Sequence, residues 1–192
     1  MRKLITAALF ALFTQSSLAG WTLDNDASTF NFLSTKKNTA TESHTFKQLS
    51  GSINDEGSAV VSVKLASVET NITIRNERMQ TFLFQIADFA SATATLSVDP
   101  NLLKNLRAGE RKSINSTIAL NFHGITKKLP TELMVTTLEN HVLQVHTVKP
   151  ILLIAADFEL NDGIEKLRTL AKLSTIDTTV PVTFTLLFQQ DN

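Results

Sequence analysis

The chain has 192 residues, which is enough for one domain with a substantial hydrophobic core. Its 18 basic and 18 acidic residues cancel, and a pI near 6.9 lacks the basic excess that nucleic-acid binding requires. The absence of cysteine excludes a disulfide framework, a cysteine nucleophile, thiolate metal sites and a lipoprotein anchor.

Residues 1–19 have the pattern of a secretory signal peptide. Arg2 and Lys3 form the basic start, residues 4–13 form an apolar run, and Ser17–Ala19 is a small-x-small cleavage signal. The apolar run is about half as long as a membrane-spanning helix requires. We therefore expect cleavage after Ala19 and a single mature domain over residues 20–192. A disulfide-free exported domain favours the bacterial periplasm.

From Trp21 onward the hydrophobic pattern mostly has a period of two, which indicates half-buried strands. In chain order, strands are predicted at residues 27–34, 43–53, 58–65, 91–98, 114–122, 131–138, 141–148, 151–158 and 180–188. Turn signals such as Asn54-Asp55-Glu56-Gly57 and Asp99-Pro100-Asn101 separate several of these strands. The pattern predicts an antiparallel sheet.

Two segments interrupt the strands. In the first, residues 71–89, three charged residues precede an aromatic-rich stretch, which predicts either a lid that closes an apolar pocket or an ordinary amphipathic corner of the core. The second is a helix in which Ile164, Leu167 and Ala171 recur at helical spacing. Asp162 and Glu165 are spaced for a capping box at its start.

Many strands, few helices and no linker or internal repeat favour a single β-barrel or sandwich. A barrel of about eight strands is either filled by its side chains or wide enough for one small ligand. Periodicity alone leaves these two interiors open, because any β core has alternating apolar faces.

Four segments in order resemble the YceI family of lipocalin-like, polyisoprenoid-binding periplasmic proteins. They are Trp21–Asp24, Phe46–Ile53, Ser67–Thr70 with Arg75–Met79, and Leu120–Lys127, and the closing part from Asp157-Phe158 through Asp162-Gly163-Ile164 is similar too. The resemblance implies an all-β, lipocalin-like antiparallel barrel of about eight strands with one or two short helices. It also implies a long apolar tunnel for an isoprenoid chain.

The sequence departs from the family pattern at two places. Arg78-Met79 stands where the family often has histidine-leucine, and Phe89-Ala90 stands where it often has tyrosine-proline. We expect the fold to tolerate both changes, and we expect any effect to fall on head-group preference and on the lid.

The apolar faces and the resemblance together assign a tunnel wall and a head-group site. The predicted wall residues are Phe30, Phe32, Phe46, Val61, Val63, Leu65, Met79, Phe82, Phe84, Phe89, Ile118, Leu120, Phe122, Phe184 and Leu186. Arg75 and Arg78 are the candidates to meet a phosphate, quinone oxygen or carboxyl group. The alternative is that these arginines form exposed ion pairs worth about 0–1 kcal/mol.

No catalytic or metal-binding residue is predicted. His44, His123, His141 and His146 show no metalloprotease spacing, and no Gly-x-Ser-x-Gly elbow occurs. The leading interpretation is a periplasmic carrier of an isoprenoid quinone or polyprenyl lipid that requires no cofactor. A lipid-modifying periplasmic enzyme and a solid barrel acting as an interaction or stress module are the alternatives. The partners considered are the lipid, the inner membrane, a b-type cytochrome and a second copy in a homodimer, but no nucleic acid.

Overall fold

The computed structural model describes residues 20–105 and 107–191. The predicted signal peptide, residues 1–19, lies outside the described residues. The described residues all belong to the domain predicted from residue 20 onward.

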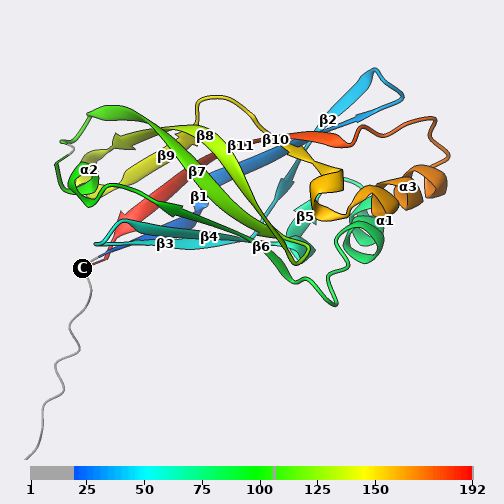
Figure 1. Cartoon of the computed structure of the whole chain (residues 1–192), viewed down its shortest axis with the longest axis horizontal. Helices are drawn as coiled ribbons and strands as arrows, with labels where there is room; N and C mark the ends of the chain where they lie inside the picture. Colours follow the sequence, from blue (N-terminus) through cyan, green and yellow to red (C-terminus); the bar gives the residue numbers. More distant parts are fainter. Residues whose placement is uncertain (1–19, 106, 192) are drawn as a thin grey trace, which may run out of the picture.

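Within the described residues, eight antiparallel strands close into a barrel (Figure 1). They are β1 (Gly20–Lys36), β3 (Leu49–Asn54), β4 (Ser58–Lys64), β6 (Ser91–Ser97), β7 (Arg111–Phe122), β8 (Ile125–Thr137), β9 (Leu143–Thr147) and β11 (Thr179–Gln190). The first and last of these strands pair to close the barrel, with Trp21 opposite Gln190 and Phe32 opposite Val182. The predicted lipocalin-like antiparallel barrel is confirmed.

Three shorter strands lengthen the sheet beyond this ring. They are β2 (Ala40–Phe46), β5 (Val68–Glu69) and β10 (Ile151–Ile154). β2 pairs with the second half of β1, whereas β3 pairs with its first residues. Likewise β10 pairs with the start of β11, and β9 pairs with its second half. Because β1 and β11 are antiparallel, β2 and β10 extend the wall at the same end of the barrel.

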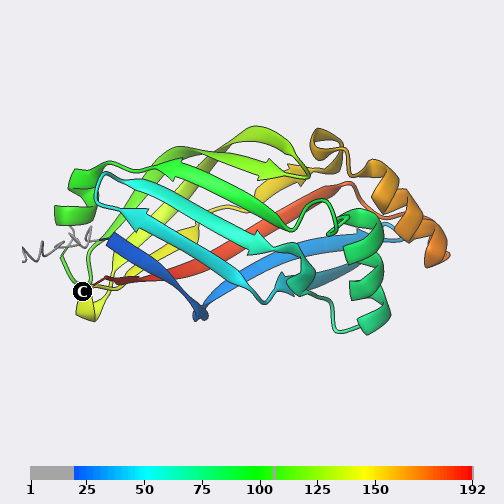
Figure 2. The ribbon, with the colours of Figure 1, turned by 90° about the horizontal axis from the view of Figure 1, so that it is seen from below.

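The helical segments lie at the two ends of the barrel (Figure 2). At one end, α1 (Thr73–Arg78) continues into the π-helical turn η2 (Met79–Leu83), and α3 (Asn161–Leu170) packs against η2. We call α1, η2 and α3 together the helical lid. At the other end lies α2 (Pro100–Asn105), and the remaining helical turns are η1 (Leu65–Ser67), η3 (Glu139–His141) and η4 (Ala155–Phe158).

Three local predictions were wrong. The strand expected at residues 43–53 is two strands, because the backbone at Lys47 and Gln48 bonds to residues 67 and 64. The strand expected at 151–158 ends at Ile154 and becomes the helical turn η4. The turn expected at Asp99-Pro100-Asn101 instead starts α2, where the Asp99 carboxylate accepts the Asn101 N–H at 2.9 Å.

The capping box predicted for α3 is also wrong. The residue before the helix is Leu160, which makes no side-chain cap hydrogen bond. The Glu165 carboxylate instead accepts a hydrogen bond from Arg168 Nε at 2.7 Å, one turn further along the helix. The helix is held mainly by its packing, through the buried Gly163 and Ile164.

Gly163 allows α3 to lie directly against η2. A Cβ atom added at Gly163 would stand 2.7 Å from the Phe82 carbonyl oxygen and 2.9 Å from the Leu83 Cα. Both neighbours are backbone atoms, so neither can move aside without displacing the lid. The absence of a side chain at residue 163 therefore sets the spacing between the two halves of the lid.

We expect Gly163→Ala to lower the free energy of unfolding by about 1 kcal/mol, because the overpacking strain of about 1–3 kcal/mol exceeds the helix-propensity gain of about 0.5–1 kcal/mol. Urea denaturation measures the change. The control is Thr169→Ala on the exposed face of the same helix, which should shift stability by less than about 0.5 kcal/mol. A Gly163→Ala protein more stable than the wild type would contradict this account.

Candidate functional site

The barrel interior contains a cavity with a volume of about 220 Å³. Each described residue that lines it is apolar, and all eight barrel strands contribute to its wall. Four phenylalanines on different elements, Phe46, Phe84, Phe122 and Phe158, follow one another along the wall with ring centroids 5.4–6.1 Å apart. The cavity therefore excludes polar ligand groups and admits hydrocarbon.

The cavity is long and narrow. Both Ile114 and Phe122 of β7 line it, and eight residue steps at about 3.3 Å each correspond to about 26 Å along the strand. Leu103 of α2 lines one end, and Met79 and Ile164 of the helical lid line the other. We call this cavity the tunnel. Its length and its wholly apolar wall suit a single extended chain.

The structure brings together nearly all of the predicted wall residues. On the tunnel lie Phe30, Phe32, Phe46, Val61, Val63, Leu65, Met79, Phe84, Ile118, Leu120, Phe122, Phe184 and Leu186. Their contact with a lipid stays a prediction. Phe82 and Phe89 do not belong to the tunnel wall, and their assignment is corrected.

Helical geometry explains why Phe82 faces outward. Met79 and Leu83 are four residues apart and therefore share the inward face of η2. Phe82 is 37 % exposed, and Lys166 Nζ lies 5.5 Å from the centroid of its ring. Phe89 packs instead on the His123 ring, with centroids 4.2 Å apart, at the β7–β8 turn.

The contribution of β8 to the wall was not predicted from the sequence. Leu129, Leu133 and Val135 line the tunnel. They alternate with outward residues at the period of two that marks the other strands, so the same signal could have found them.

At the lid end, the inner faces of β1 and β2 change from aromatic to polar. Toward the lid, the inward residues of β2 are Phe46, His44 and Glu42, and on β1 Phe32 is followed by Ser34. His44 lies opposite Phe32, and Glu42 lies opposite Ser34. We call this part of the wall the polar rim.

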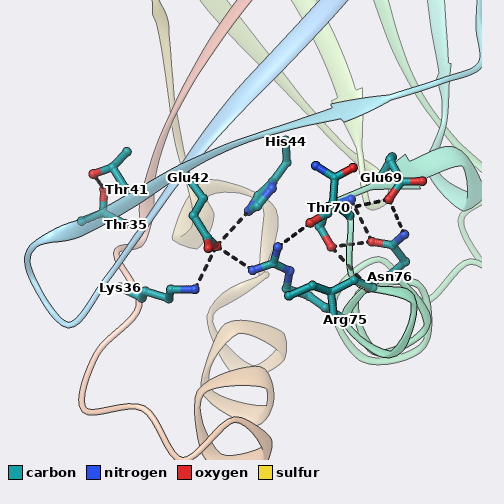
Figure 3. Close-up of polar contacts among 11 residues, drawn as sticks. Thr35, Lys36, Thr41, Glu42, His44, Glu69, Thr70, Arg75 and Asn76 are labelled. Carbon is teal, nitrogen blue, oxygen red and sulfur yellow. Dashed lines mark hydrogen bonds and ion pairs between the residues drawn. The ribbon is translucent and has the colours of Figure 1, made fainter.

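Arg75 ties the helical lid to the polar rim (Figure 3). Its Nη1 donates to Glu42 Oε2 at 2.6 Å, and its Nη2 donates to the Thr70 carbonyl oxygen at 2.5 Å. Lys36 Nζ lies 2.9 Å from the same Glu42 oxygen. The hydrogen bond from Lys36 and the charge and hydrogen bond of Arg75 hold the pKa of Glu42 below its ordinary value. Arg75 therefore lies in the polar rim, and its contact with a head group stays a prediction.

His44 is a buried member of this cluster that the sequence analysis did not assign. It is 6 % exposed, and its ring meets Phe32 edge-on with centroids 5.4 Å apart. Its Nε2 lies 3.8 Å from Glu42 Oε2, while its Nδ1 has no hydrogen-bond partner among the described residues. Burial, assisted by the positive charge of Arg75, lowers the pKa of His44. No sequence pattern around His44 predicts that it is buried beside Glu42 and Arg75.

Arg78 does not join Arg75 in the polar rim. Its Nη1 donates to the Leu170 carbonyl oxygen at 3.4 Å, which links α1 to the last turn of α3. Its role as a head-group ligand stays a prediction.

A second polar cluster fixes the start of α1. Asn76 Oδ1 accepts hydrogen bonds from the Thr70 N–H at 2.9 Å and the Thr70 hydroxyl at 2.6 Å. Asn76 Nδ2 donates to Glu69, and the hydrogen bonds from Lys47 and Asn76 lower the pKa of Glu69 to about 2. These bonds hold α1 in the position from which Arg75 reaches Glu42.

Neither a metal site nor a membrane-spanning helix is found in the described part of the chain. Among residues 20–105 and 107–191, no three histidine or acidic side chains gather closely enough to hold a metal ion. In the same residues, no helix has the length and apolar character needed to cross a membrane.

The closed barrel, its apolar tunnel and its polar rim define a lipocalin-like binding protein. The model of the YceI-like domain family matches residues 21–188, so the chain belongs to the YceI-like family. That family has a binding-protein fold. The comparison with curated proteins finds no match.

Solved structures agree with this assignment. A polyisoprenoid-binding domain from Saccharophagus degradans, implicated in plant cell wall breakdown, is 39 % identical with a TM-score of 0.88, over 90 % of this chain and 99 % of that one. BcnA from Burkholderia cenocepacia is 17 % identical with a TM-score of 0.68, over 86 % and 98 %. A YceI protein from Campylobacter jejuni is 13 % identical with a TM-score of 0.54, over 78 % and 84 %. The last two share the fold.

The lowered pKa of His44 predicts a pH dependence of folding. The unfolded chain takes up the proton near the ordinary histidine value of 6.5, whereas the folded chain does so only at lower pH. The contribution of neutral His44 to the free energy of unfolding is therefore fully present above about pH 6.5. It is lost as the pH falls through the pKa of the folded state. Glu42, Arg75 and Lys36 are the charged groups around this ring.

We expect His44→Gln to lose less stability than the wild type when the pH is lowered from 7 to 5. Urea denaturation at both pH values measures the difference. His141→Gln, in the exposed turn η3, is the control and should keep the wild-type dependence. Equal pH dependence in wild type and His44→Gln would show that another group is responsible.

Proposed function

We propose that this protein is a periplasmic carrier that holds one long-chain amphiphile, with its tail in the tunnel and its head group at the polar rim. The observation that carries the proposal is the continuous apolar tunnel, with the polar rim beside its wall at the lid end. A relative with 39 % identity is described as polyisoprenoid-binding, which supports an isoprenoid quinone or polyprenyl lipid as the ligand.

The tail supplies most of the affinity. Each buried methylene contributes about 0.8 kcal/mol, so two prenyl units of five carbons contribute about 8 kcal/mol before the costs of association. A net hydrogen bond adds only about 1 kcal/mol. The carrier therefore selects for chain length and shape first and for the head group second.

The signal-peptide pattern of residues 1–19 supports the periplasmic location. Exchange of lipid with the inner membrane would use the lid end, where apolar side chains are exposed beside the tunnel. Ile74 of α1 is 51 % exposed, and Leu152 and Ile154 of β10 are 58 % and 47 % exposed. Contact with a b-type cytochrome and formation of a homodimer stay predictions.

A binding role without catalysis suits the composition of the site. Among the described residues, those that line the tunnel are all apolar and offer no nucleophile, acid or base to a chain held within it. The open tunnel also favours a carrier over a solid barrel that serves as an interaction or stress module. Turnover of the bound lipid would instead support the lipid-modifying alternative.

We expect protein purified gently from its native periplasm to carry about one long-chain amphiphile per barrel, because the emptied tunnel would expose its apolar wall to water. Organic extraction followed by mass spectrometry identifies the lipid and its stoichiometry. Protein that is repeatedly lipid-free and that takes up neither ubiquinone nor a polyprenyl phosphate would contradict the carrier proposal.

We expect Leu120→Trp to reduce lipid uptake sharply while the lipid-free protein keeps its stability, because the indole would fill tunnel space that the ligand occupies. If Leu120 were instead part of a close-packed core, the substitution would destabilise the protein by about 1–3 kcal/mol. Lipid titration and urea denaturation separate the two cases.

Thr117→Trp is the matched control for this substitution. Thr117 is exposed on the outer face of the same strand, β7. An outward tryptophan should leave both lipid uptake and stability close to wild type. Lower stability with unchanged uptake in Leu120→Trp would mean that the ligand does not pass this residue.

A further inference from the structure

The cluster of Glu42, His44 and Arg75 lies directly behind two residues of the tunnel wall. Phe46 and Phe32 line the tunnel. His44 is the next inward residue of β2 after Phe46, and its ring touches Phe32. His44 is therefore the first polar side chain of β2 beyond the tunnel wall in the direction of the lid.

Two nitrogen atoms of this cluster are buried and lack a partner. His44 Nδ1 and Arg75 Nε make no hydrogen bond among the described residues. Buried polar atoms are nearly always hydrogen bonded in folded proteins, so a pair of unpartnered atoms next to the tunnel wall indicates a place for a polar ligand group. The side chain of His44 is only 4 % exposed, so it is packed within the protein and is not a surface group.

The two free atoms differ in their hydrogen-bonding roles. Arg75 Nε is a donor. The Glu42 carboxylate 3.8 Å from His44 Nε2 favours the tautomer that carries the proton on Nε2, which leaves Nδ1 as an acceptor. A hydroxyl group can both donate and accept, and a carbonyl oxygen can accept from Arg75.

The positive charge of the Arg75 guanidinium is already paired with the Glu42 carboxylate. Arg75 Nη1 and Lys36 Nζ both contact Glu42 Oε2, and Arg75 Nη2 binds the Thr70 carbonyl oxygen. A phosphate at the free Nε would lie near the ionised Glu42 carboxylate. It would also bring three terminal oxygens to a site with one free donor, which would leave buried charge uncompensated.

We infer that Glu42, His44 and Arg75 form a head-group site that favours an uncharged hydroxyl or carbonyl group over a phosphate. Glu42 is the specificity-determining residue, since its carboxylate neutralises the arginine that a phosphate would otherwise use. This inference rests on the proposed lipid-carrier function and narrows its ligands to prenols, quinols and quinones.

Farnesol and farnesyl monophosphate share one hydrocarbon chain and differ in the head group, so equilibrium dialysis of both at pH 7.5 and fixed ionic strength tests the inference. We expect the wild type to bind farnesol about tenfold or more tightly than the phosphate. In Glu42→Gln the preference should shrink by about tenfold, because Arg75 then has no carboxylate to neutralise it. Glu77→Gln makes the same chemical change at an exposed position of α1 and should keep the wild-type preference.

His44→Phe gives a second test that does not disturb the ion pair. The new ring keeps the packing against Phe32 and removes both nitrogens. Binding of farnesol should weaken about fivefold, while binding of the C15 hydrocarbon farnesane should not change. This variant still tests the inference if Glu42→Gln fails to fold.

The outcomes separate the inference from the proposed function. If no C15 compound binds the wild type, the lipid-carrier function itself fails. If all three compounds bind and the wild type takes the phosphate as tightly as farnesol, the carrier stands and the head-group inference is wrong. An unchanged preference in a folded Glu42→Gln protein would also overturn it.

Discussion

The pairing of β1 with β11 is the constraint on which the tunnel depends. An open sheet with the same strands would expose the inner side chains of both edges, and the apolar channel would not exist. A bulge between Asp24 and Thr29 allows the two strands to stay paired on both sides of a bend. Asp24 and Ser28 stabilise that bulge, and the Ser28 hydroxyl bonds to both the Asp24 carbonyl and the Leu187 N–H. Closure thus depends on a few polar contacts that serve a large apolar interior.

The interior becomes polar at the end where β1 and β2 extend beyond the eight-stranded ring. At the α2 end, the buried Leu102 and Leu103 make the boundary apolar. At the lid end, β1 and β2 continue past their aromatic residues, and the alternation of side chains brings Glu42 and His44 to the inner face. Arg75 then joins this face from a separate element. In the proposed carrier function, this change from apolar to polar would orient the head group of the amphiphile toward the lid.

The sequence predicted most of the strands, and nearly all of the wall residues that it assigned lie on the tunnel, because the period of two is a local property that each strand carries in its own residues. Barrel closure pairs β1 with β11, which lie at opposite ends of the domain sequence. No local pattern indicates such a pairing, so only the family resemblance indicated it. Phe82 was misplaced because the inward face of η2 depends on its helical register. His44 was missed because a lone histidine acquires its role only from Glu42 and Arg75, which reach it from elsewhere in the chain.

The closure of β1 on β11 also decides where the protein can be joined to something else. The Asp191 N–H bonds to the Gly20 carbonyl oxygen at 2.8 Å, so the first and last described residues are neighbours. They lie at the α2 end, opposite the helical lid (Figure 1). A tether or a fused domain attached at either residue would leave the lid unobstructed. The fold therefore allows a fused domain or a tether to determine where the barrel is located without covering the helical lid.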